Sequence, residues 1–273
     1  MRRNTLVAML GALAVAAAGS ASAAEPLKVH AAGSLRAAMT ALAAGFEQAQ
    51  GPNAGRKVTL AFGPSGLLRQ RLADGEASDV FASANMTHPQ ALADAGRADA
   101  VQPFARNTLC GLATPGFSLQ GKPLAQRLLD ADVRVGTSTP KADPSGDYAF
   151  QMFERIEATG AAAPGATAAL KAKALQLTGG PNSPKPQPGR SQYGELVNVG
   201  QADIFITYCT NVAEARREFP ALQSVPVPDA INVGARYGIV TMRPASPAAQ
   251  AFVTYVLSPA GQQLLSTFGF SPP

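Results

Sequence analysis

Short apolar runs recur along the chain and alternate with stretches that have the spacing of amphipathic helices. The runs at 27–31, 58–62 and 79–83 predict strands. The stretch after the first run carries apolar residues at i, i+4, i+7 and i+11, which form one face of a helix: Leu35, Met39, Leu42 and Phe46. Strands that alternate with helices favour a mostly parallel sheet with helices on its faces.

The same alternation returns further along the chain. It predicts strands at 133–136, 204–208 and 237–242, and helices at 148–157, 247–257 and 261–268. The segment 179–189 is rich in proline and glycine and is expected to be a loop. The segment 225–228 contains two prolines and is expected to be extended and to cross between domains. The predicted fold class is α/β, with two units of similar organisation.

Serines stand at three turns where a predicted strand ends and a helical pattern begins: Ser34, Ser65 and Ser145. The start of a helix has free N–H groups and the positive end of the helix dipole, which favour a bound anion. Ligands of open α/β sheets bind at the carboxyl ends of the strands. One serine at such a place is usually a helix cap. Three in one chain predict a site for one small anion.

The first 23 residues have the pattern of a secretory signal peptide. Arg2 and Arg3 precede an apolar stretch that is too short to span a bilayer as a mature helix, and 21–23 fits a cleavage site. The mature chain is expected to begin near Ala24 and to be exported to the periplasm. No cysteine lies near the cut, so no lipid anchor is expected there.

Length and charge narrow the class of partner. The mature chain is long enough for a large core and for two domains. The whole chain has 23 Lys and Arg against 18 Asp and Glu, and removal of Arg2 and Arg3 leaves a mildly positive balance. Without runs of Lys or Arg and without tryptophan, the chain is not expected to bind nucleic acid. The balance is compatible with an anionic ligand.

Two other kinds of site fit the residues less well. A serine hydrolase needs a general base and a nucleophile elbow, and the turn 63–66 lacks the elbow's spacing. His30 lies on a strand that points it away from Ser34, and His88 precedes Pro89 in a turn expected at the surface. The histidines and cysteines lack metal-ligand spacing, and no phosphate-binding glycine loop is present. No catalysis, metal site or cofactor is therefore expected.

Cys110 and Cys209 are the only cysteines of the chain. In an exported protein they can form one disulfide, which closes a loop of about 100 residues and contributes about 4.7 kcal/mol in the chain-entropy account. Two buried free thiols are the alternative.

Several segments, taken in order, resemble one family: Ala31–Leu35, Phe62–Gln70, Gly75–Ala84, Asp143–Ala149, Ile206–Tyr208 and Ser258–Phe270. Their order and spacing resemble the periplasmic molybdate-binding proteins of ABC importers, over essentially the whole mature chain. The resemblance implies a two-lobed periplasmic binding protein fold that closes on its ligand. Lobe one is expected at 24–105 and 226–273, and lobe two at 106–225. A monomer, an inner-membrane ABC permease as partner, and a disulfide between Cys110 and Cys209 are also implied.

The resemblance further implies which residues hold the ligand. Proteins of this family bind a tetrahedral oxyanion with neutral donors from both lobes, and the metal enters inside the oxyanion. By position, the donors are hydroxyl and N–H groups of Ser34 and Ser65, the N–H of Ser145, the phenol of Tyr208, and an N–H near Arg190 or Ser191.

The segment around Arg190 departs from the family pattern because it is richer in proline and more basic. Its guanidinium either contacts the ligand through a charge-assisted bidentate bond or lies solvated in a loop. The expected ligand is molybdate or tungstate, with sulfate or a small organic anion as the alternative.

Overall fold

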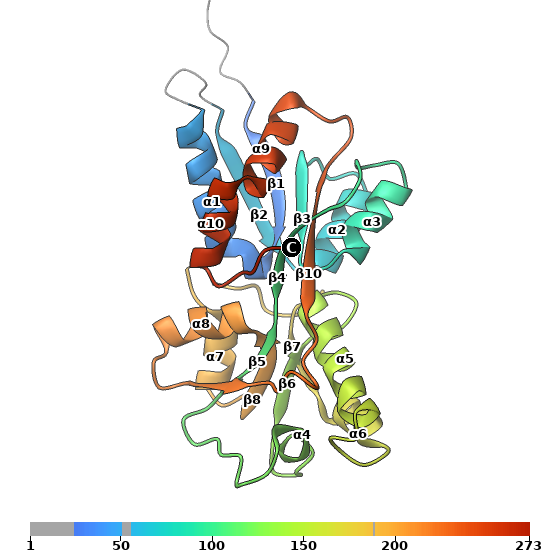
Figure 1. Cartoon of the computed structure of the whole chain (residues 1–273), viewed down its shortest axis with the longest axis vertical. Helices are drawn as coiled ribbons and strands as arrows, with labels where there is room; N and C mark the ends of the chain where they lie inside the picture. Colours follow the sequence, from blue (N-terminus) through green and yellow to red (C-terminus); the bar gives the residue numbers. More distant parts are fainter. Residues whose placement is uncertain (1–24, 51–55, 188) are drawn as a thin grey trace, which may run out of the picture.

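The computed structural model describes residues 25–50, 56–187 and 189–273 and has two lobes stacked along its long axis (Figure 1). Each lobe contains a five-stranded sheet with helices on both faces. The predicted α/β class and two-lobed fold are confirmed. The predicted signal peptide lies outside the described residues. In the part of the chain that the structure describes, no helix is long and apolar enough to cross a membrane.

The first lobe is built on parallel strands with one antiparallel strand inserted. The order β2-β1-β3-β10-β4 corresponds to Val58–Gly63, Leu27–Ala32, Val80–Ser83, Ala235–Thr241 and Gln102–Asn107. Strands β1, β2 and β3 are parallel, and β10 is antiparallel to both of its neighbours. The helices are α1 (Arg36–Ala49), α2 (Ser65–Ala73), α3 (Thr87–Asp94), α9 (Pro247–Leu257) and α10 (Pro259–Thr267), and a 3-10 turn, η1 (Gly33–Leu35), precedes α1.

The second lobe repeats this plan. The order β7-β6-β8-β5-β9 corresponds to Leu175–Thr178, Val135–Ser138, Ile204–Tyr208, Leu109–Ala113 and Gln223–Pro226. Here β6 is parallel to β7 and β8, while β5 is antiparallel to β8 and β9. The helices are α4 (Leu124–Arg127), α5 (Pro144–Ala158), α6 (Ala166–Lys173), α7 (Gln192–Asn198) and α8 (Cys209–Glu218). The carboxyl ends of the parallel strands of both lobes therefore meet the boundary between the lobes (Figure 1).

Most predicted elements are present, and the differences have local causes. The apolar face of α1 is buried as expected. Helix α5 begins earlier than expected, at Pro144, because the Asp143 side chain accepts a hydrogen bond from the Ser145 N–H and caps it. The predicted crossing segment 225–228 begins inside β9, where Pro226 is tolerated because β9 is an edge strand. Strands β4 and β7 were not predicted.

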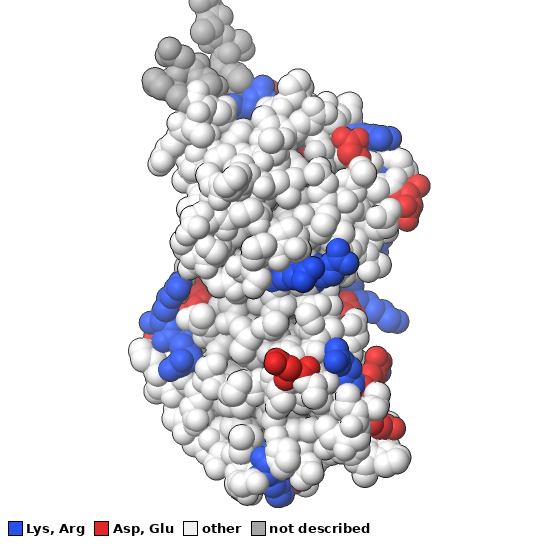
Figure 2. All heavy atoms as spheres, in the orientation of Figure 1, with Lys and Arg blue, Asp and Glu red and all other residues white. Residues whose placement is uncertain are grey.

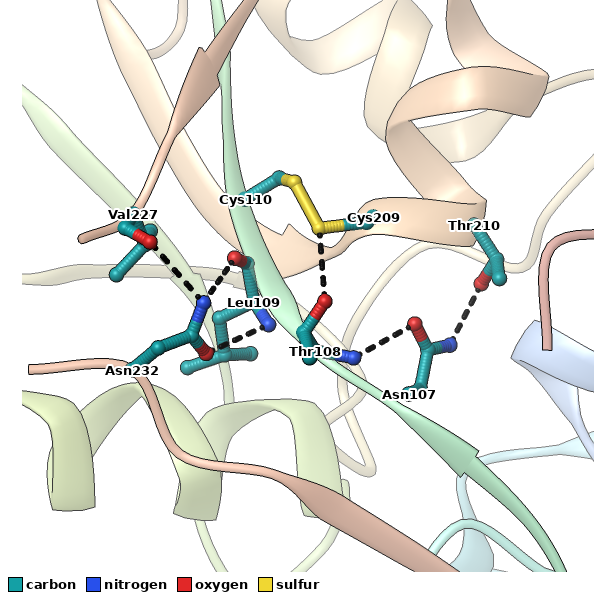
Figure 3. The surroundings of a disulfide bond; sticks show 8 residues. All are labelled: Asn107, Thr108, Leu109, Cys110, Cys209, Thr210, Val227 and Asn232. Carbon is teal, nitrogen blue, oxygen red and sulfur yellow. Dashed lines mark hydrogen bonds between the residues drawn. A yellow bond between two sulfur atoms is a disulfide. The ribbon is translucent and has the colours of Figure 1, made fainter. Parts of the chain in front are cut away.

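Two chain segments cross between the lobes and are tied together at the hinge. Only Thr108 separates β4 from β5 on the outgoing segment. On the returning segment, the Asn232 side chain accepts from the Leu109 N–H at 3.0 Å and donates to the Leu109 carbonyl at 2.9 Å (Figure 3). It also donates to the Val227 carbonyl at 3.3 Å. One amide therefore holds both crossings in register.

The predicted disulfide is present beside this hinge. Cys110 lies on β5 and Cys209 begins α8, and their Cα atoms are 4.8 Å apart (Figure 3). Thr108 donates its hydroxyl to the Cys209 sulfur at 3.3 Å. The disulfide therefore fixes the end of β8 to the outgoing crossing.

Replacing Cys110 and Cys209 together by alanine should lower the free energy of unfolding by roughly 3–4 kcal/mol, because the unfolded chain regains the freedom of a long loop. Denaturant unfolding of the oxidised wild type and the double variant measures the difference. Wild type treated with a reductant is the control and should match the variant. Equal stability of the oxidised wild type and the variant would contradict the expected contribution.

Candidate functional site

A cavity of about 490 Å³ lies between the lobes. Its wall includes Ser34 and Ser65 from the first lobe and Asp143, Ser191 and Tyr208 from the second. Figure 2 shows that most of the viewed face is uncharged and that Lys and Arg side chains gather near the waist between the lobes. Of the predicted ligand residues, Ser145 alone does not line the cavity.

The two lobe-one serines follow the carboxyl ends of neighbouring strands β1 and β2. Ser34 lies in the turn η1, is half-buried, and its hydroxyl is 3.0 Å from the Tyr237 phenol. Ser65 is the first residue of α2 and is 1% exposed. Its hydroxyl oxygen accepts from the Ala84 N–H at 3.1 Å. This bond orients the Ser65 oxygen while leaving its proton available to a group in the cavity.

The Tyr208 phenol faces these serines from the second lobe. The residue ends β8 and is 1% exposed, and its hydroxyl has no hydrogen-bond partner among the described residues. Desolvation by burial raises the pKa of Tyr208 well above its ordinary value, so the phenol remains a proton donor at neutral pH. A buried hydroxyl without a partner is costly, which makes it a strong candidate for a ligand contact.

The backbone donors predicted in the second lobe are engaged within the protein. The Ser145 N–H donates to Asp143 Oδ1 at 3.0 Å, and the Ser145 hydroxyl is 3.2 Å from that of Thr207. The Ser191 N–H donates to Glu218 Oε2 at 2.7 Å. In both places a carboxylate of the protein accepts the N–H that the resemblance assigns to a ligand.

The sequence suggested that the Arg190 guanidinium either contacts the ligand or lies solvated in a loop. In the structure it has a third environment. Its guanidinium pairs with Glu218 and lies 3.6 Å from the Glu195 carboxylate. It also stacks on the Phe219 ring at 5.6 Å. The Arg190 N–H donates to the Gln187 carbonyl at 3.2 Å. Arg190 therefore lines the cavity as one half of an ion pair inside the second lobe.

Asp143 is a residue of the site that the sequence reading missed. It caps α5, and Gly179 packs so closely against it that a Cβ on Gly179 would lie 2.6 Å from Asp143 Oδ2. No Lys, Arg or His of the described residues forms an ion pair with it. Desolvation by burial raises the pKa of Asp143 to about 6. An aspartate before Pro-Ser at a helix start was a visible capping signal, but it did not reveal that the carboxylate faces the cavity.

The lobes touch directly beside Asp143. The Gly66 N–H, in the first turn of α2, donates to the Ala142 carbonyl of the second lobe at 2.9 Å. A Cβ on Gly66 would overlap the Lys141 and Ala142 carbonyl oxygens, so this approach requires glycine. The structure is therefore closed, with the start of α2 hydrogen-bonded to the residue before Asp143 and the start of α5 capped by the Asp143 carboxylate.

The histidines lie away from the cavity wall. His30 is buried on β1, and its Nε2 is 2.8 Å from Glu76. His88 was expected in an exposed turn, but it is half-buried in the first turn of α3, where desolvation lowers its pKa to about 4. Within the described ranges, no cluster of three or more His, Cys, Asp or Glu side chains is arranged to hold a metal ion.

Comparisons with known proteins identify the family and the fold of the chain. The model of the bacterial extracellular solute-binding protein family matches residues 27–271. The uncharacterized protein PM1146 of Pasteurella multocida is 34% identical over 90% of this chain and 98% of its own length. The molybdate-binding protein ModA of Mycobacterium tuberculosis is 29% identical over 94% of this chain and 88% of its own.

Two solved structures have the same fold. The periplasmic molybdate-binding protein of Azotobacter vinelandii has a TM-score of 0.68 at 20% identity and covers 90% of this chain and 99% of its own. The sulfate-binding protein SubI of Mycobacterium tuberculosis has a TM-score of 0.70 at 18% identity and covers 91% of this chain and 87% of its own. The resemblance found in the sequence is thereby confirmed.

Replacing Asp143 by asparagine should stabilise the protein at pH 7. The folded-state pKa of about 6 lies above the ordinary value of 3.8, so the folded protein binds this proton more tightly and loses stability as pH rises from about 4 to about 6. Asparagine still caps α5 but does not titrate. We expect a gain in unfolding free energy of up to about 3 kcal/mol at pH 7 that fades towards pH 4.

Chemical denaturation at pH 4 and pH 7 measures this gain. The exposed Asp229 provides the control, because Asp229→Asn should change stability by less than about 0.5 kcal/mol at either pH. An Asp143→Asn variant that is less stable than wild type at pH 7 would show that the charged cap outweighs the desolvation.

Proposed function

Because the chain belongs to the bacterial extracellular solute-binding protein family, we propose that it captures a tetrahedral oxyanion, molybdate or tungstate, in the cleft between its lobes. It delivers the ligand to an ABC permease of the inner membrane, acts in the periplasm as a monomer, and performs no catalysis. Full-length relatives named as molybdate-binding proteins support the choice of ligand. The lobe boundaries 24–105 with 226–273, and 106–225, belong to the same proposal.

One observation carries the proposal. Hydroxyl groups of Ser34, Ser65 and Tyr208 come from opposite lobes and line one cavity, and the buried Tyr208 phenol lacks a partner among the described residues. An oxyanion has acceptor oxygens on every side, so it can accept from both lobes at once. Each hydrogen bond to a charged group contributes roughly 1.5–3 kcal/mol, which favours the closed state when the ligand is bound.

Neutral donors are suited to a fully deprotonated dianion. Isolated charges are costly to bury, but several hydrogen bonds offset the lost hydration. After the costs of closure and lost ligand freedom, sub-micromolar affinity requires a net free energy of about −8 kcal/mol or better. The three side-chain hydroxyls supply part of this free energy, and the N–H groups of Ser145, Ser191 and Gly66 contribute only if they leave the acceptors that they have in this structure.

A second candidate ligand is sulfate or a small organic anion. The cavity of about 490 Å³ is larger than a four-oxygen anion needs, since a water molecule occupies about 30 Å³. Part of its wall is apolar and comes from Phe62, Leu67, Pro181 and Pro184. Of these two alternatives, the apolar wall and the size of the cavity favour the small organic anion, with an anionic head and an uncharged body, over sulfate. The sulfate-binding structural neighbour has the same fold but does not identify the ligand here.

Calorimetric titration of the mature protein with molybdate, tungstate, sulfate and phosphate tests the proposal directly. We expect molybdate and tungstate to bind tightly with one-to-one stoichiometry and sulfate to bind far more weakly. A panel of small carboxylates and organic phosphates is the comparison set. Binding of an organic anion without any response to molybdate or tungstate would replace the first ligand class with the second.

The variant Tyr208→Phe should lose affinity without losing stability. The phenol has no protein partner among the described residues, so its removal leaves no hydrogen-bonding group of the fold unsatisfied. We expect about 10- to 100-fold weaker oxyanion binding, equivalent to one charge-assisted hydrogen bond. The control Tyr255→Phe, on α9, should leave affinity unchanged. Wild-type affinity in Tyr208→Phe would remove this residue from the site.

A further inference from the structure

We propose that Asp143 takes up a proton when the cleft binds a dianion, so that this carboxylate sets both the pH dependence and the charge selectivity of binding. The proposal rests on the proposed function, because it concerns the same cleft. The family resemblance assigns the ligand donor in this turn to Ser145 and gives Asp143 no contact with the ligand.

The position of the carboxylate is the first argument. Asp143 lines the cavity with Ser65 and Tyr208, and Oδ1 holds the Ser145 N–H at 3.0 Å. The adjacent Ala142 carbonyl accepts from the Gly66 N–H of the opposite lobe. The carboxylate thus lies at the start of α5, one residue from the backbone contact with the start of α2, and the N–H groups and dipole of a helix start favour an anion. A ligand dianion attracted to the same donors would lie close to Asp143.

The lack of a neutralising partner is the second argument. Glu218 is the other carboxylate that accepts from a backbone N–H expected to bind the ligand, that of Ser191, and Glu218 is paired with Arg190. Asp143 forms no ion pair among the described residues, and its nearest charged neighbour on its own helix is Asp147. Tyr193 of α7 and Tyr208 of β8 also face it, and both remain neutral at physiological pH because burial raises the pKa of each phenol.

The remaining charged groups of the cavity wall do not neutralise Asp143. They are Arg36, Arg71, Lys185, Arg190 and Glu214. Arg71 pairs with Glu76, and Arg36 stacks on the Phe62 ring at 4.5 Å. None of the four cations lies within ion-pair distance of the Asp143 carboxylate.

Protonation resolves the conflict between the two anions. An ionised Asp143 repels a dianion, whereas a protonated Asp143 can donate its O–H to a ligand oxygen. The pKa of about 6 means that Asp143 takes this proton from solvent at neutral pH at little cost, and a nearby dianion raises the pKa further. The cleft then favours a dianion more strongly in mildly acidic solution. A ligand that presents its own hydrogen-bond donor would leave Asp143 ionised.

Calorimetry with molybdate and with sulfate, between pH 5.5 and pH 8.5, tests the proposal. Phosphate is excluded as a probe because it titrates in this range. Above pH 6, wild-type affinity should fall about tenfold for each pH unit until the pKa of the bound state is reached. Titrations at pH 7 in two buffers of different ionisation enthalpy should report uptake of about 0.9 proton per ligand, the ionised fraction of a group with a pKa of about 6.

Two variants identify the group that takes up the proton. Asp143→Asn keeps the cap and carries an uncharged donor, so its affinity should be nearly independent of pH and its proton uptake close to zero. Glu214→Gln is the matched control, because Glu214 lines the same cavity but faces Arg36 and Arg217. This control should retain the wild-type pH slope.

The outcomes separate the two proposals. Binding that is independent of pH in wild type, or a slope that persists in Asp143→Asn, overturns the role of Asp143 and leaves the oxyanion function intact. A slope that disappears in Glu214→Gln instead assigns the proton to Glu214. If neither wild type nor Asp143→Asn binds either anion at any pH, the oxyanion function fails, and the role of Asp143 fails with it.

Discussion

The hydrogen bonds between Asn232 and the backbone of Leu109 are the contact on which the rest of the site depends. They join the outgoing and the returning chain segments that connect the two lobes in the described residues (Figure 3). Leu109 is also the β5 residue paired with Tyr208 on β8, and the residues that follow these two, Cys110 on β5 and Cys209 at the start of α8, form the disulfide. The position of the Tyr208 phenol is therefore set by the hinge itself. A change at Asn232 would alter both the angle of the lobes and the placement of a cleft donor.

A chain of hydrogen bonds connects the same hinge to the serine on the other side of the cleft. The Ser34 hydroxyl is 3.0 Å from the Tyr237 phenol, and Asn107 donates to that phenol at 3.5 Å and to the Thr210 hydroxyl at 2.8 Å. The Tyr208 and Tyr237 rings pack beside this chain with centroids 5.7 Å apart. The groups proposed to contact the ligand and the groups at the hinge thus share hydrogen-bond partners, which would couple ligand binding in the cleft to the geometry of the hinge.

The features of this arrangement that depend on neighbouring residues could be predicted from the sequence. Strand runs, the amphipathic face of α1, and serines at helix starts are encoded by neighbouring residues, and their positions at strand ends place Ser34 and Ser65 in one cleft. Contacts between side chains that are distant in the sequence could not be predicted in this way. Arg190 pairs with Glu218, and Ser191 with the same carboxylate, through contacts that only the packing of α7 against α8 creates. No local pattern contains that pairing.

N–H groups at helix starts that face a closed cleft need acceptors, and this protein provides two of them with its own carboxylates. Helix starts facing a cleft must find acceptors or remain unsatisfied at a cost of about 1–3 kcal/mol each. In the second lobe, Asp143 and Glu218 supply those acceptors for the N–H groups of Ser145 and Ser191. An anion entering the cleft must then compete with a resident carboxylate. Two unit charges 4 Å apart interact by about 4 kcal/mol near a protein surface, so an ionised Asp143 would oppose a dianion more strongly than one hydrogen bond could favour it. Under the proposed function, the charge on this one aspartate therefore governs oxyanion affinity as much as the number of hydrogen-bond donors in the cleft does.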